Sequence, residues 1–425
     1  MLKDKSKQEL LELRAQLQKE YDAFKAKGLK LDMSRGKPGA DQLNLSNGLF
    51  DAVTKADYDR NLFTHPIDYR NYGSLTGIEE LRKIFSDMLE VPAENIIVCG
   101  NSSLNLMFDY ITQCMLSGVD GSHPWCKEEK VKFLCPVPGY DRHFAITEYY
   151  GIEMLPVPMT GKGPDMDAVE ALVKDPAVKG MFCVPKYSNP TGETYSAETV
   201  ERIASLKPAA PDFRIIWDNA YIIHDLKNET DRLENIFSAL ERHGNEDMVV
   251  EFVSTSKISF PGSGVACIAA STNNIEAIKR RMQFQTIGHD KLNMLRHVIF
   301  FKSLDGMKAH MELHKAILAP KFKAVEDEFE RSLGGLGIAE WTKPNGGYFI
   351  SLDVMPGTAK EVGRLAKEAG VVLTTVGATY PYGKDPEDKN IRIAPSFPPV
   401  DELELATKLL CVCIKLAAVE KLLGE

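Results

Sequence analysis

Lys257 is the residue of this chain best placed to react with a carbonyl compound. It follows the hydroxyl residues Ser254 and Ser256 and the apolar, β-branched run 248–253, which predicts a buried strand. Hydroxyls and free backbone amides suit a phosphate group, and a lysine amine can condense with an aldehyde. Together they indicate pyridoxal 5'-phosphate, which its enzymes hold as a lysine Schiff base. On its own, so short a string is more typical of a solvated lysine after a strand.

Two upstream segments supply partners for such a cofactor. A predicted strand ends before Asp218, whose carboxylate could pair with the protonated pyridine nitrogen, and Tyr221 could donate to the phenolic oxygen of the ring. Asn189 follows the apolar run 180–184 and could donate its amide to the same oxygen. Taken separately, Asp218 could cap a helix and Tyr221 could be ordinary packing. Asn189, Asp218 and Lys257 each follow a strand, where parallel sheets collect binding residues.

These motifs resemble the fold-type I, class I/II aminotransferases, which use pyridoxal phosphate. The resemblance runs from about Leu31 to Phe397 and is carried by Asn-Pro-Thr-Gly at 189–192, Asp-x-x-Tyr at 218–221 and Ser-x-Ser-Lys at 254–257. The strings Arg-Gly-Lys-Pro-Gly at 35–39 and Ser-Lys-Ile-Ser-Phe-Pro-Gly at 256–262 are most similar to the type Ic aspartate aminotransferase subgroup. The resemblance implies a large domain with a mainly parallel, seven-stranded-type sheet flanked by helices, and a smaller α+β domain.

A phosphate site is also indicated before the predicted helix that begins near Leu104. Ser102 and Ser103 follow the short apolar run 96–99, and their hydroxyls would stand beside the free amides of a helix N-terminus. The alternative is a pair of N-cap residues, which is compatible with anion binding. The resemblance assigns Ser102, Ser103 and Leu104 to the cofactor, together with Ser254 and Ser256.

The resemblance implies roles for residues outside these strands as well. Tyr140 would stack on the pyridine face, with a core tyrosine as the alternative, and Tyr72 would reach a phosphate in the partner subunit. Arg392 would hold the substrate α-carboxylate with Asn189, since its five-donor fork fits a carboxylate in a bidentate manner. Gly36 and Arg35 belong to a glycine loop that would close over the substrate.

Two positions leave questions open. The family often has an arginine about eight residues after the lysine, to balance the phosphate, but here that position is Val265, with no Arg or Lys from Ile258 to Ser271. An acidic substrate also needs a second cation for its distal carboxylate. The segment 285–296, which includes Lys291, offers candidates that the sequence does not separate.

Composition narrows the class of protein. The 425-residue chain has a net charge of −9 with acids and bases interspersed, which argues against a nucleic-acid partner. Its eight cysteines are scattered without a CxxC pair, which suits free thiols in a reducing compartment, and no metal site is predicted. The first residues are charged, and the longest apolar stretch is too short to span a membrane, so we expect a cytoplasmic protein.

The expected organisation has three parts. Residues 1–48 form an N-terminal helix and the substrate loop, which belong to the small domain. Residues 49–310 form the large cofactor domain, where strands alternate with helices. Residues 311–425 form the rest of the small domain, where a long helical pattern lies near 313–333 and the run 346–352 predicts a strand. The N-terminal helix is expected to pack on the small domain or across a dimer.

The sequence therefore predicts a homodimeric aminotransferase with ping-pong kinetics, in which Lys257 also serves as the base. The substrates would be aspartate or glutamate and a 2-oxo acid. A different pyridoxal-phosphate reaction, such as β-elimination, would use the same motifs. A non-catalytic effector-sensing domain is the other alternative, although about thirty residues before Ser34 are too few for a DNA-binding helix-turn-helix.

Overall fold

Most of the predicted strands lie in one seven-stranded sheet. The computed structural model describes residues 1–56, 68–119 and 121–424. The strands follow the order β2-β8-β7-β6-β5-β3-β4, and all neighbours are parallel except β8, which is antiparallel to β2 and β7. The bounds are β2 (Ile96–Val98), β3 (Lys132–Val137), β4 (Glu153–Pro158), β5 (Val178–Cys183), β6 (Arg214–Asp218), β7 (Val249–Ser254) and β8 (Ala266–Ala270). This is the predicted α/β fold with a mainly parallel sheet.

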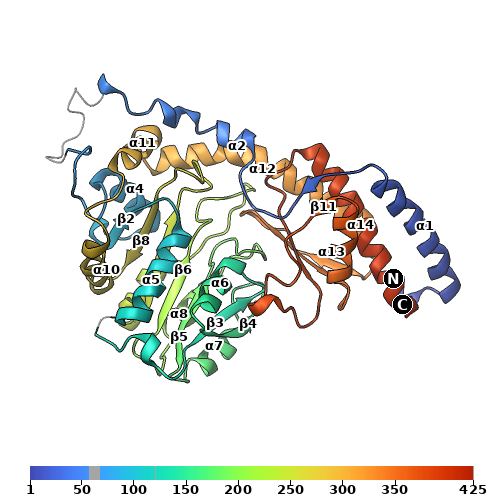
Figure 1. Ribbon diagram of the computed structural model, residues 1–425, viewed down its shortest axis with the longest axis horizontal. Helices are drawn as coiled ribbons and strands as arrows, with labels where there is room; N and C mark the ends of the chain where they lie inside the picture. The colour runs from blue at the N-terminus through green and yellow to red at the C-terminus, as the bar shows by residue number, and fades with distance from the viewer. Residues whose placement is uncertain (57–67, 120, 425) are drawn as a thin grey trace.

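Helices cover both faces of this sheet (Figure 1). They are α4 (Glu79–Leu89), α5 (Ser103–Ser117), α6 (Asp141–Tyr149), α7 (Met166–Leu172), α8 (Ala197–Ala204), α9 (Ile236–His243), α10 (Thr272–Gln285) and α11 (Lys291–Phe301). Alternate residues of β6 enter different cores, because Ile216 packs in the core with α5, and Ile215 and Trp217 pack in the core with α8. A strand buried on both sides is continuously apolar, which is why the sequence runs were recognisable.

A second, smaller set of strands lies at the other end of the molecule. The antiparallel strands β9 (Ala339–Trp341), β10 (Ile350–Val354) and β12 (Asn390–Ile393) form a sheet in the order β12-β10-β9. A separate parallel pair joins β1 (Leu31–Asp32) to β11 (Val371–Val372). The helices here are α2 (Ala40–Asn44), α13 (Ala359–Glu368) and α14 (Val400–Leu423), and the long helix α12 (Leu304–Leu333) connects the two ends.

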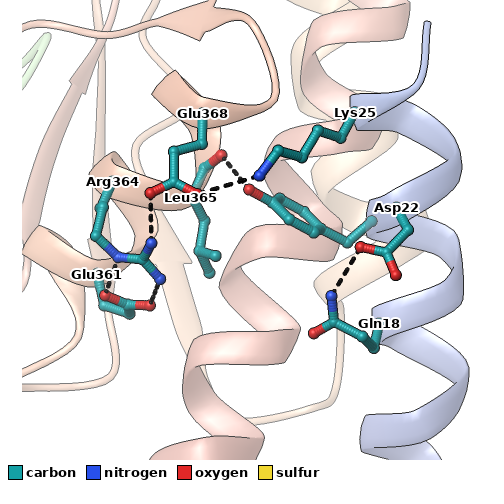
Figure 2. Close-up of polar contacts among 8 residues, drawn as sticks. Gln18, Asp22, Lys25, Glu361, Arg364, Leu365 and Glu368 are labelled. Atoms are coloured by element: carbon teal, nitrogen blue, oxygen red, sulfur yellow. Dashed lines mark hydrogen bonds and ion pairs between the residues drawn. The ribbon is translucent and has the colours of Figure 1, made fainter.

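The N-terminal helix α1 (Lys7–Lys25) packs on α14 within the same chain, as Figure 1 shows. Its buried side chains Leu10, Leu17 and Tyr21 join the core of the smaller region. The Tyr21 hydroxyl donates to the carbonyl of Leu365 on α13 at 3.0 Å. Figure 2 shows the exposed charges around this contact, where Lys25 lies 3.4 Å from Glu368. The sequence left two locations open for this helix, and in the structure it packs on the smaller region of its own chain.

Two predicted boundaries differ from the structure. The long helix was expected to begin at 313 but begins at Leu304, because Ser303 caps it by accepting the amide of Gly306 at 3.2 Å. The strand expected from Gly346 begins only at Ile350, since Gly347 has a φ of +84°. The predicted domain boundaries remain predictions, and the one at 310 falls inside α12. None of the helices in the described ranges has the length and apolarity to span a bilayer.

Candidate active site

Lys257 lies three residues beyond the end of β7, in the interior between the two regions of the chain. Its Nζ atom is 5.0 Å from the centre of the Tyr221 ring and 5.9 Å from that of Tyr348. Burial lowers the pKa of the Lys257 ammonium, and the carboxylate of Asp218 opposes that shift. A lowered pKa increases the fraction of free amine near neutral pH, which both nucleophilic attack and proton transfer require.

Asp218 is the last residue of β6 and is 3% exposed. His143 of α6 donates from Nε2 to Oδ2 of Asp218 at 2.9 Å, and the imidazole stacks on Phe182 with ring centres 4.4 Å apart. The other oxygen, Oδ1, is buried without a hydrogen-bond partner. Buried carboxylate oxygens are rarely left without a donor, so this oxygen fits an N–H that a bound molecule supplies.

Two tyrosines border the same cluster. Burial raises the pKa of the Tyr221 hydroxyl well above its usual value and that of Tyr140 to about 12, and the Asp218 carboxylate adds to both shifts. Both hydroxyls therefore remain protonated donors at neutral pH. Tyr140 is the N-cap of α6 and meets His143 edge-on, with ring centres 4.9 Å apart.

The predicted phosphate residues gather where α5 begins. Ser254 donates to Ser256 at 3.1 Å, and Ser256 donates to the carbonyl of Asn101 at 3.1 Å. Ser102 is the N-cap of α5, but its hydroxyl makes no capping bond, and Ser103 and Leu104 are the first two helical residues. The hydroxyl hydrogens of Ser254 and Ser256 are therefore engaged within the protein and would have to rotate to donate to an anion. The Ser102 hydroxyl and the first amides of this fifteen-residue helix offer an anion the positive end of the helix dipole.

Val265 stands where the phosphate arginine was expected, and it has no basic substitute within its own loop. It is 1% exposed, and its amide donates to the Thr255 hydroxyl at 3.0 Å. Without that arginine, the residues predicted to bind the phosphate offer hydroxyls, backbone amides and a helix dipole.

Arg392 lies on β12 with its guanidinium buried against the Phe349 ring, 4.9 Å from the ring centre. Its Nη1 atom donates to Asp141 at 2.7 Å and to Asn189 at 3.2 Å, and Nε donates to Thr374 at 3.3 Å. Arg392 and Asn189, which were both predicted to bind the substrate, are therefore in direct contact. Asn189 itself lies six residues beyond the end of β5, farther from its strand than expected.

The predicted glycine loop lies against the same ring. A Cβ on Gly36 would stand 2.4 Å from Cζ of Phe349, so only glycine fits without displacing that ring. The Ser34 carbonyl accepts the hydroxyl of Thr374 at 2.6 Å, which links the loop to Arg392. Arg35 is exposed, and no described contact joins it to Arg392.

Tyr72 and Lys291 make no described hydrogen bond to Lys257 or to the phosphate serines, although other residues of 285–296 border the loop 100–102. The Tyr72 side chain is 79% exposed, and none of its described contacts is with Lys257 or the phosphate serines. Lys291 is 5% exposed and donates to the carbonyl of Gly73 at 3.0 Å, so within its own chain it supports the Tyr72 segment.

A buried polar network connects the N-terminal segment to the peptide of Lys257. Its members are Gln42, Ser46, His310, His314 and Tyr348. Gln42 donates to the Tyr348 hydroxyl at 2.8 Å, and that hydroxyl lies 3.5 Å from the Lys257 carbonyl. His314 bridges Gln42 and His310, at 3.0 and 3.1 Å, and His310 also contacts the carbonyl of Ile258. The network holds the start of the loop that carries Lys257.

This network predicts acid lability. Burial and the neighbouring His310 ring lower the pKa of His314 from 6.5 to about 4. The unfolded chain therefore takes up a proton below pH 6.5 that the folded chain refuses until about pH 4, so stability is lost as pH falls through this window. At about 1.4 kcal/mol per unit, the loss from His314 reaches roughly 3 kcal/mol.

Urea unfolding at pH 7 and pH 5 measures this effect. His314→Gln is expected to flatten the pH dependence, whereas His123→Gln, at an exposed histidine, should leave it unchanged. An equally steep pH dependence in His314→Gln would place the acid lability elsewhere.

Sequence reasoning missed several members of the site. Asp141 directly follows the predicted Tyr140, and His143 lies two residues further on. Their place in the first turn of a helix next to Tyr140 was the only sign in the sequence that they belong to the site. Gln42, Thr374 and Tyr348 carry no local motif. They join the site through contacts between segments about 90 to 340 residues apart along the chain.

Known proteins are similar to this chain in both sequence and fold. The sequence profile of the aspartate amino-transferase family matches residues 5–425. An aspartate aminotransferase from Corynebacterium glutamicum is 47% identical over 405 residues, which cover 95% of this chain and 93% of that protein. A crystal structure of an aspartate transaminase from the same species has a TM-score of 0.96 at 46% identity, with 99% of each chain covered.

More distant structures share the fold alone. The α-aminoadipate aminotransferase LysN from Thermus thermophilus has a TM-score of 0.73 at 19% identity, covering 92% of this chain and 93% of that one. The fold and these relatives make this chain an aminotransferase. It belongs to the aspartate aminotransferase family, and the family that its sequence motifs predicted is confirmed.

Proposed function

We propose that this enzyme is a pyridoxal-phosphate-dependent aspartate aminotransferase. It transfers the amino group of aspartate or glutamate to a 2-oxo acid, in two half-reactions with ping-pong kinetics. The observation that carries the cofactor assignment is the buried Oδ1 of Asp218, which lacks a donor beside a lysine of lowered pKa. The 47% identical aspartate aminotransferase from C. glutamicum supports the substrate class.

The residues present fit this cofactor in three places. The Asp218 oxygen would accept the N–H of the pyridinium ring, and the amine of Lys257 would hold the aldehyde carbon. The hydroxyls of Ser102, Ser254 and Ser256, with the first amides of α5, would receive the phosphate. Tyr221 and Asn189 would lie at the phenolic oxygen, and Tyr140 at the ring face.

The bound cofactor would supply an electron sink for the bonds at the substrate α-carbon. With the cofactor in place, the free amine of Lys257 would act as the general base that takes the α-proton of the substrate. Burial lowers the pKa of this amine, which increases the fraction that is free to accept a proton. Asp218 would keep the pyridine nitrogen protonated, and its bond from His143 fixes the direction of the carboxylate.

Arg392 would bind the α-carboxylate and so direct the α-proton toward Lys257. The Phe349 ring covers the guanidinium and Gly36 lies against that ring, and the low exposure of Arg392 strengthens its charge interactions. We assign the distal carboxylate of the substrate to the 285–296 segment of a partner subunit.

The proposed assembly is a homodimer with shared sites. Tyr72 is 79% exposed, and the nearby chain segment carries Phe284 and Ile287, which are 88% and 63% exposed. Exposed apolar side chains beside a proposed cofactor residue favour an interface between two copies of this chain. We also place the enzyme in the cytoplasm, because its eight cysteines are all unpaired.

A panel of amino acids tests the substrate assignment. Each amino acid is added to the purified enzyme without an acceptor, and the change of the cofactor absorbance and the oxo acid released are followed. Aspartate and glutamate are expected to react at least tenfold faster than leucine or phenylalanine, because only they present a second carboxylate. An aromatic or aliphatic preference would reject the substrate class, and ammonia release without cofactor amination would reject the reaction.

A further inference from the structure

The arginine proposed to bind the substrate carboxylate already holds a carboxylate of the protein. Nη1 of Arg392 lies 2.7 Å from Oδ1 of Asp141, the shortest of its contacts. Asn189 takes the second Nη1 hydrogen and Thr374 takes the Nε hydrogen. Nη2 makes no hydrogen bond to a described residue, so half of the fork remains open to a ligand.

The two partners differ in how firmly they are held. The Arg392 side chain is 7% exposed and packs on Phe349, whereas the Asp141 side chain is 32% exposed. Asp141 is also the first residue of the nine-residue helix α6, where a carboxylate is favoured by the helix dipole. Asp141 can therefore release Arg392 and remain stabilised, while the buried arginine needs an anion at all times.

A bidentate ligand carboxylate would require two N–H groups on one edge of the fork. The edge formed by Nη1 and Nη2 includes the nitrogen that Asp141 occupies, and the edge formed by Nε and Nη2 includes the bond to Thr374. In either position a second carboxylate would enter beside Asp141 and meet its negative charge.

We infer that Asp141 is an internal competitor for the substrate carboxylate, which keeps Arg392 neutralised in the empty site and weakens the binding of carboxylate ligands. This inference rests on the proposed role of Arg392 in substrate binding. Asp141 would thereby raise the KM and promote product release, since each product must leave the same arginine. It is a specificity-determining residue and takes no part in proton transfer.

Calorimetric titration of the holoenzyme with succinate and with propionate tests the competition. Asp141→Asn keeps the shape of the side chain and removes its charge, and it is expected to bind both acids roughly tenfold more tightly, which is the effect of one charge-assisted hydrogen bond. Propionate has a single carboxylate. An equal gain in affinity for succinate and propionate would therefore show that only one cation, Arg392, is affected. Asp141→Ser also removes the charge and places a hydroxyl at the N-terminus of α6. It serves as the second variant in case Asp141→Asn misfolds.

Inhibition by sulfate and the split between KM and kcat provide a second readout. An unneutralised Arg392 is expected to make Asp141→Asn more sensitive to sulfate and to lower its KM for the amino acid without a rise in kcat. A purely structural role of Asp141 would change thermal stability and leave sulfate sensitivity as it was.

Arg392→Gln separates the two hypotheses. If Arg392→Gln binds succinate as the wild type does, the proposed substrate site is wrong. If Arg392→Gln loses binding but Asp141→Asn and Asp141→Ser bind succinate no more tightly than the wild type, only the competition is overturned.

Discussion

Replacing Lys257 with alanine is expected to lower the rate of amino transfer by at least about four orders of magnitude, the upper range for removal of a positioned proton carrier. The substitution also removes the only lysine whose amine lies within the described cluster, so the covalent link to the cofactor is lost. The single-turnover rate with aspartate measures the first effect. The second effect, loss of the covalent link, is measured by the loss of the visible cofactor absorbance after dialysis.

A second buried lysine provides the matched control. Lys186 follows β5, is 8% exposed, and donates to the carbonyl of Ile222 at 2.9 Å and to Asp225 at 3.2 Å, with no described hydrogen bond to Lys257. Lys186→Met should lose stability but retain the absorbance and the single-turnover rate. Reduction with borohydride and peptide mapping should label Lys257 in the wild type. Labelling of another lysine, or a dialysis-resistant absorbance in Lys257→Ala, would contradict the assignment.

The sequence predicted those parts of the fold and site that depend on local patterns. Continuous β-branched runs identify strands buried on both faces, and β6 and β7 lie within a residue of the predicted bounds. Family motifs assigned both Arg392 and Asn189 to substrate binding, and the structure adds the contact between them across 203 residues of the chain. Lys257 was expected a few residues after the predicted run 248–253, and it lies three residues beyond the end of β7.

The partners of the predicted residues could not be found in this way. His143 reaches Asp218 only because α6 lies over the ends of β5 and β6, and Asp141 reaches Arg392 across 251 residues. Gln42 and His314 form a network between segments that share no motif. Such contacts depend on how elements pack, and a helix of ordinary composition does not reveal which of its polar residues will face the site.

Asp218→Asn is expected to stabilise the cofactor-free protein and to impair the loaded enzyme. The carboxylate is 3% exposed and leaves Oδ1 without a donor, so a neutral amide of the same shape reduces the cost of burial. We expect a gain on the order of 1 kcal/mol in the free energy of unfolding without cofactor. With cofactor, loss of the charged partner of the pyridine nitrogen should slow amino transfer by roughly 10²- to 10³-fold, as for other preorganised electrostatic groups.

Asp212 is the matched control, because it is 4% exposed but fully paired. It accepts from Lys179 at 2.8 Å and from Trp125 at 2.8 Å. Asp212→Asn should therefore destabilise the protein by about 3–5 kcal/mol, since a buried lysine loses its partner, with little change in the rate of the protein that remains folded. Urea unfolding with and without cofactor measures both variants. If Asp218→Asn instead destabilised the cofactor-free protein as Asp212→Asn does, Asp218 would be a structural carboxylate, and its free oxygen would not be a place kept for the cofactor.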